Sequence, residues 1–133
     1  MATYAIKNID EMEATWGGAF KLARAELGVD AFGLQVIDMP PNIDQFPEHD
    51  HAEDGMQEVY VPVSGSGEIE IDGERHPLEP GSMVMVNSGV MRKVITGDEP
   101  IRLIAIGGIP GKPYEAPDTT QLGTPDPLQQ QAN

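Results

Sequence analysis

Two histidines and a glutamate lie close together in the stretch PEHDHAEDGMQEVYV, and their types are those of a metal site. His49 and His51 are two positions apart, so on an extended strand both imidazoles project from one face, about 6.5 to 7 Å apart. Glu58 would face the other side of a continuous strand, but Gly55 supplies a turn that can bring it back. Two imidazoles and one carboxylate suit Mn(II), Fe(II), Ni(II), Co(II) or Zn(II). The alternative interpretation is a pair of exposed histidines in an acidic loop.

The composition limits the partners that the chain can have. With 22 acidic and 8 basic residues its net charge is -14, so nucleic acid or an anionic membrane surface would repel it. No apolar run approaches the roughly 20 residues of a membrane span, and the N-terminus does not have the pattern of a signal peptide. We therefore expect a cytoplasmic protein without nucleic-acid or membrane partners. The absence of cysteine removes thiolate nucleophiles and sulfur metal ligands.

The elements that would position the histidines and the glutamate are mostly short strands. The length of 133 residues fits one domain, and 15 glycines and 12 prolines indicate many turns. Six strands at about ten-residue spacing are predicted, which indicates an all-β sandwich or barrel. These strands cover residues 32–38, 58–63, 68–72, 83–86, 91–96 and 101–106.

The two ends of the chain have a different character. One helix is expected within residues 10–28, ending on Gly28 and placing Phe20, Ala23 and Leu27 on one face. The C-terminal stretch is rich in proline and polar residues without an apolar period, although Tyr114 can fix its start to the barrel. The predicted segments are an N-terminal helical segment packing on the barrel (1–31), the barrel (32–110) and a partly disordered tail (111–133).

The stretch from His49 to Gly65 resembles the first conserved motif of the cupin superfamily. That motif has His-x-His, a glutamate some residues later, six further residues and a glycine, matched here by His49, His51, Glu58 and Gly65. The resemblance covers about residues 32–106 and is to small single-domain bacterial cupins. It implies an all-β double-stranded β-helix, or jelly-roll barrel, with one short N-terminal helix in this chain. It also implies a homodimer and a small-molecule ligand in the barrel.

The second cupin motif is altered in this sequence. Asn87 stands where cupins usually have proline, and Arg92 stands where they usually have a histidine, the fourth ligand. Arginine stays protonated and has no lone pair to donate, so Arg92 cannot bind a metal. If Val94 faces the core, Arg92 shares that face. A buried arginine needs a carboxylate partner, and Glu58 is the nearest candidate.

Two functional interpretations stay open, beside a structural dimer with a vestigial site and a plain surface role for Arg92. In the first, His49, His51 and Glu58 hold a divalent ion, Mn, Fe, Ni or Zn, and the protein oxygenates or isomerises a small acid or sugar-like ligand. In the second, Arg92 pairs with Glu58, no metal is bound, and the protein is a non-catalytic ligand-binding or sensor cupin. Arg92 and Tyr60, which has the strand parity of Glu58, are the candidate ligand-binding residues. No catalytic residue is assigned.

Overall fold

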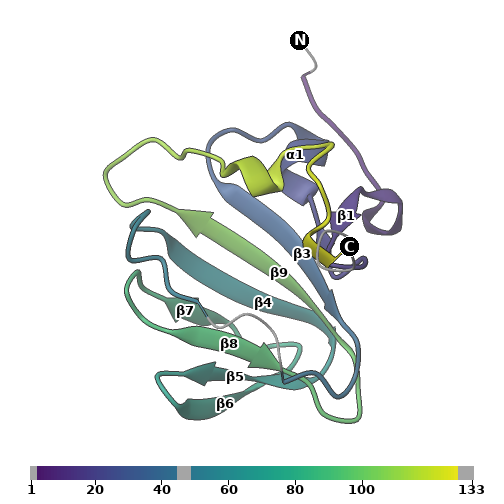
Figure 1. Cartoon of the computed structure of the whole chain (residues 1–133), viewed down its shortest axis with the longest axis vertical. Coiled ribbons are helices and arrows are strands. Elements are labelled where there is room, and N and C mark those ends of the chain that lie inside the picture. Colours follow the sequence, from purple (N-terminus) through teal and green to yellow (C-terminus); the bar gives the residue numbers. More distant parts are fainter. Residues whose placement is uncertain (1–2, 45–48, 129–133) are drawn as a thin grey trace.

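Two antiparallel sheets form the protein (Figure 1), for which a computed structural model describes residues 3–44 and 49–128. The strands are β1 (Ala14–Thr15), β2 (Phe20–Lys21), β3 (Gly33–Met39), β4 (Gln57–Gly65), β5 (Gly67–Ile71), β6 (Glu74–Leu78), β7 (Val84–Val86), β8 (Arg92–Ile95) and β9 (Ile101–Gly108). The larger sheet has the order β1-β2-β3-β9-β4-β7, and the smaller has the order β6-β5-β8. Within the described residues, no helix is long and apolar enough to cross a membrane.

The six predicted strands are confirmed, and so is the all-β class. They correspond to β3, β4, β5, β7, β8 and β9, with ends that differ by at most two residues. Strand β6 is not among the six predicted strands, and its sequence contains Pro77. Proline removes a hydrogen-bond donor and is tolerated where β6 lies, at the edge of the smaller sheet.

The core lies between the two sheets and explains the direction of Arg92. Alternating side chains of both sheets fill it, namely Ile37, Met39, Tyr60, Ile69, Leu78, Val86, Val94, Ile101, Leu103 and Ala105. Arg92 precedes Val94 by two residues in β8, and none of its surface is exposed. Arg92 therefore faces the interior, and the surface role for this residue is wrong. Alternation alone leaves both faces possible, because Lys93 and Ile95 share the face opposite Val94, and the place of Arg92 in the second motif is what favours the interior.

The N-terminal helix is shorter than expected. Helix α1 spans Ala23–Leu27 and ends on Gly28, which takes the left-handed conformation at φ 75° and is the predicted C-cap. The expected helical turns before it are wrong: a 3₁₀ turn (Ile9–Glu11) and the β1-β2 hairpin occupy that region. Trp16, Gly17 and Gly18 all have positive φ angles, which a right-handed helix cannot contain. Phe20 accordingly lies in β2 and not on a helical face.

The N-terminal elements pack on the outer face of the larger sheet. Met12 and Ala23 form a second apolar cluster there with Val36 of β3. Strand β3 is thus buried on both faces, because Ile37 and Met39 point into the core between the sheets.

The described part of the C-terminal tail lies against these N-terminal elements (Figure 1). The Asp126 carboxylate accepts hydrogen bonds from the backbone N–H groups of Trp16 and Gly17, at 2.9 and 3.1 Å. A second 3₁₀ turn (Asp118–Thr120) precedes this contact. The predicted disorder at the end of the tail falls partly on residues 129–133, which lie outside the described residues. The division into three segments stays a prediction.

Candidate metal site

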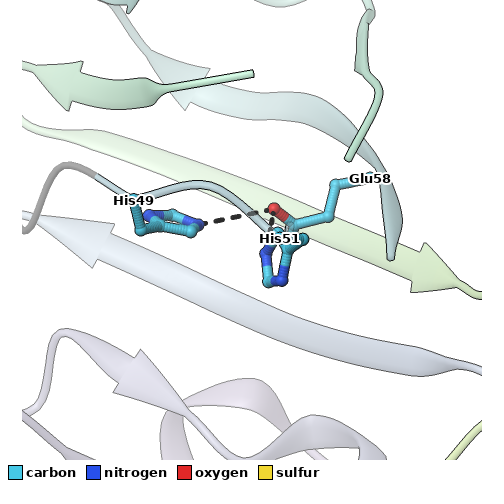
Figure 2. Close-up of side chains that lie close together, drawn as sticks. All are labelled: His49, His51 and Glu58. Atoms are coloured by element: carbon cyan, nitrogen blue, oxygen red, sulfur yellow. Dashed lines mark hydrogen bonds and ion pairs between the residues drawn. The ribbon is translucent and has the colours of Figure 1, made fainter. Parts of the chain in front are cut away.

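His49, His51 and Glu58 meet near the start of β4, where Glu58 is buried and the two histidines are partly buried (Figure 2). One potential ligand atom from each residue lies within 4.8 Å of the others. Glu58 belongs to β4, where it is paired with Gly107 of β9 on one side and with Val86 of β7 on the other. Because β4 has a neighbour on both sides here, the sheet holds the Glu58 backbone in a fixed position.

Backbone pairing places His49 beside Arg92. The N–H of His49 donates to the carbonyl of Arg92 at 3.0 Å, and the N–H of Arg92 donates to the carbonyl of His49 at 2.9 Å. Directly opposed residues of an antiparallel pair project their side chains from the same face. Since Arg92 points into the interior, His49 points there too.

A turn after His51 brings Glu58 back to the histidines, as predicted. The N–H of Gly55 donates to the carbonyl of His51 at 2.8 Å, and Gly55 has a φ of 73°. An L-residue with a side chain is strained at this angle, so glycine is the residue that suits this turn. The chain then enters β4 with the Glu58 side chain directed at His51.

One oxygen of Glu58 is the point toward which four side chains are directed. Oε1 accepts a hydrogen bond from the Tyr60 hydroxyl at 2.7 Å and one from Nη1 of Arg92 at 3.1 Å. Nε2 of His51 lies 3.0 Å from the same oxygen, and Nε2 of His49 lies 3.6 Å from it.

The protonation state of Glu58 follows from these contacts. Burial alone would raise the pKa of Glu58, but hydrogen bonds from His49, His51 and Tyr60, with the charge of His51, lower it far below its ordinary value. Burial and the Glu58 charge raise the pKa of Tyr60, so its hydroxyl stays a donor. Glu58 is therefore a carboxylate at neutral pH, which is the form that binds a metal.

His51 has a carboxylate behind its ring that sequence analysis missed. Nδ1 of His51 lies 3.0 Å from Oδ2 of Asp54. A carboxylate at one ring nitrogen orients a histidine that binds a metal through the other nitrogen. The three donors, and the support of His51 by Asp54, therefore fit a divalent transition ion. The spacing of three residues across a turn is the signal that could have identified Asp54.

We expect Asp54→Asn to lower the pKa of His51 in metal-free protein. Partial burial would lower that pKa, but the hydrogen bonds and charges of Glu58 and Asp54 outweigh burial and raise it above 6.5. In the wild type, the stability that this shift contributes is fully present below the unfolded pKa of about 6.5 and is lost as pH rises through the folded pKa. Titration of the imidazole signals by NMR in chelator-treated protein measures the change.

Asp50→Asn is the matched control for this titration, because Asp50 accepts a hydrogen bond from the backbone of Ala52 and is not among the groups that shift His51. The control should leave the His51 titration unchanged. An equal His51 pKa in wild type and Asp54→Asn would show that Asp54 does not support the ring.

Arg92 and Tyr60, the predicted ligand-binding residues, lie behind Glu58. Besides its contact with Glu58, Arg92 donates from Nη2 to the carbonyl of Asn87 at 2.7 Å. Tyr60 is 2% exposed and Arg92 is 0% exposed, and neither is among the described residues that line the adjoining pocket. Both side chains therefore contact a member of the candidate metal site, and their role toward a ligand stays a prediction.

A pocket of about 330 Å³ opens beside the candidate metal site. His49, His51 and Glu58 form part of its wall. Aromatic and aliphatic side chains form much of the remainder, among them Trp16, Phe20, Leu34, Met56 and Tyr114. A pocket of this size with mostly apolar walls suits a small organic molecule.

Solved structures similar to this chain share its fold. A cupin protein from Bacteroides fragilis has a TM-score of 0.69 at 21% identity, over 94% of this chain and 99% of that one. A predicted oxalate decarboxylase from Thermotoga maritima has a TM-score of 0.52 at 19% identity, over 59% of this chain and 68% of that one. The Cupin_2 domain of an XRE family transcriptional regulator from Enterobacter cloacae has a TM-score of 0.54 at 24% identity, over 62% of this chain and 86% of that one.

The comparison with protein families gives the same answer as the fold. A search of curated proteins finds no match. The family described as "Cupin domain" matches residues 35–107, which is more than half of the chain and includes every residue of the candidate metal site. The expected double-stranded β-helix is thereby confirmed, and the chain belongs to the cupin family.

Proposed function

We propose that this cupin binds a divalent transition ion, Mn, Fe, Ni or Zn, through His49, His51 and Glu58, and takes a small organic molecule into the adjoining pocket. The observation that carries the proposal is the convergence of three donor atoms within 4.8 Å on the pocket wall. Three protein ligands leave coordination positions open for a substrate. The proposed chemistry is oxygenation or isomerisation of a small acid or sugar-like compound, and the ion would supply Lewis acidity.

The residues around the metal site would prepare it for this task. Hydrogen bonds from Tyr60 and Arg92 would orient Glu58, and Asp54 would orient His51. The apolar pocket walls limit the access of water, which strengthens electrostatic interactions with a bound ligand. A homodimer in the cytoplasm without nucleic-acid or membrane partners remains part of the proposal.

A metal-free binding function is the second candidate, and the contact between Arg92 and Glu58 favours it. Nη1 of Arg92 already donates to the oxygen toward which both histidines are directed. A guanidinium at this place neutralises the Glu58 charge without an ion. The protein would then capture a ligand without turnover, and its similarity to a cupin domain of a transcriptional regulator supports a sensor of this kind.

Metal titration decides between the two candidates. Protein purified without a histidine tag or chelator would be analysed for its metal content, then titrated calorimetrically with Mn(II), Ni(II) and Zn(II). We expect one ion per chain. Because each variant removes one donor atom, His49→Ala, His51→Ala and Glu58→Gln should each weaken binding by about tenfold or more.

His76→Ala is the control for these variants. His76 is exposed in β6 and contacts Glu74, so its removal should leave metal binding unchanged. Unchanged binding in all three site variants would exclude His49, His51 and Glu58 as ligands. A wild type that binds none of the ions would favour the metal-free function.

A further inference from the structure

Arg24 is a buried cation on the wall of the pocket. It lies in α1 and is 7% exposed, yet it lines the same pocket as the candidate metal site. Its Nη1 donates to the carbonyl of Val29 at 3.0 Å. Its Nη2 donates to the carbonyl of Thr120 at 3.4 Å and to the side-chain oxygen of Gln121 at 3.3 Å. All three acceptors are neutral oxygens.

The charge of Arg24 has no counterpart in the described part of the chain. None of the described carboxylates lies within ion-pair distance of its guanidinium, and its Nε–H is buried without a hydrogen-bond partner among the described residues. Burial of an unpaired charge is unfavourable. The other buried arginine, Arg92, has a carboxylate partner in Glu58. A ligand carboxylate in the pocket would supply the missing negative charge, and its planar shape matches guanidinium.

Tyr114 is a further polar residue in the pocket that Arg24 and the candidate metal site share. It lines the pocket, and a Cβ atom at position 33 would lie 2.9 Å from its hydroxyl, so Gly33 permits its approach to the sheet. Burial raises the pKa of Tyr114, Arg24 lowers it, and Asp54 and Glu58 raise it. The charge of Arg24 and the charges of Asp54 and Glu58 therefore act on the Tyr114 hydroxyl in opposite directions.

We propose that Arg24 binds the carboxylate of a small organic acid, and that the ligand of this pocket is such an acid and not a neutral sugar-like compound. Its hydrocarbon part would lie against the apolar walls, which include Phe20 and Leu34. The inference rests on the proposed function in that it names the ligand class of the same pocket. The net charge of -14 repels anions at long range, so the preference for an acid has to arise locally.

Matched acids and amides test this proposal. Straight-chain carboxylates from butanoate to octanoate and their primary amides differ chiefly in charge. Binding would be measured by calorimetry and ligand-observed NMR at about 0.15 M salt, where long-range repulsion is screened. We expect the best acid to bind the wild type about tenfold or more tightly than its amide. Arg24→Gln should abolish this preference, and Arg24→Lys should keep part of it, because a cation remains.

Arg75→Gln is the control, because it removes one positive charge from an exposed side chain of β6 and should keep the preference for acids. The ratio of acid to amide affinity is the decisive quantity. If Arg24 had only a structural role, its substitution would weaken the binding of acids and amides equally. Thermal melting shows whether Arg24→Gln is folded. If it is not folded, the ratio of acid to amide affinity is compared between the wild type and Arg24→Lys instead. A wild type that binds no acid, or that prefers the amides, overturns the proposal.

The titrations would be run on chelator-treated protein and on protein loaded with Zn(II). A preference for acids that depends on Arg24 in chelator-treated protein supports the proposal even if the metal function fails. Normal metal binding without any preference for acids overturns the role of Arg24 alone. Acid binding that needs Zn(II) and is unchanged in Arg24→Gln would mean that the metal, and not Arg24, binds the carboxylate.

Discussion

Arg92→His is expected to increase the affinity of the site for Ni(II) and Zn(II) by about hundredfold or more. In the wild type, Nη1 of Arg92 lies 3.1 Å from Oε1 of Glu58, so its charge lies close to any ion that Glu58 binds. A charge of +1 about 5 Å from a +2 ion is repelled by roughly 6 to 7 kcal/mol at an effective dielectric constant of 20. Pairing with Glu58 reduces this repulsion. Histidine removes the charge at neutral pH and adds a fourth donor.

Two companion variants separate the causes of this gain. Arg92→Gln removes the charge without adding an imidazole, so its affinity should lie between those of the wild type and Arg92→His. Arg75→His introduces a histidine at an exposed position of β6 and should not change the affinity. Calorimetric titration with elemental analysis measures all four proteins. Tight stoichiometric metal in the wild type, with no gain in Arg92→His, would show that Arg92 does not oppose metal binding.

Short-range geometry made much of the candidate metal site predictable from sequence. The parity of β-strand residues places Tyr60 on the side of Glu58 and Arg92 on the side of Val94, and both placements are confirmed. Gly55 was the residue that allowed a turn, and it has the positive φ that the turn requires. Such relations depend on neighbouring residues and on a period of two, and they do not require knowledge of the tertiary structure.

The rest of the pocket depends on contacts between distant segments. Arg24 donates to the carbonyl of Thr120, 96 residues later in the chain. A local sequence pattern cannot predict a contact across this separation. The apolar spacing before α1 predicts a helix, but three consecutive residues from Trp16 onward have positive φ angles and prevent one. Asp54 lies in an acidic stretch that resembles a solvent-exposed loop in the sequence. Its contact with His51 depends on the turn that places the two side chains together.

The contact between Glu58 and Arg92 should be the largest single electrostatic contribution to stability in the core. Glu58→Met is expected to cost about 3 to 5 kcal/mol, because it leaves the Arg92 charge buried and unpaired. Arg92→Met should cost less, because Glu58 keeps its contacts with Tyr60 and His51. The double variant should cost clearly less than the sum, since no unpaired charge remains. A residual loss is expected, because Tyr60 and Asn87 each lose a hydrogen-bond partner.

Urea unfolding of the four proteins in chelator-containing buffer measures this coupling. An exposed pair of the same residue types is the control: Nε of Arg75 lies 3.5 Å from Oε1 of Glu70, and the Arg75 side chain is 53% exposed. Its coupling should be about 0 to 1 kcal/mol. Additive losses at Glu58 and Arg92 would contradict a paired, metal-free ground state. A strong coupling would mean that a metal has to share Glu58 with Arg92 or displace Arg92, which is the physical reason to expect a higher metal affinity in Arg92→His.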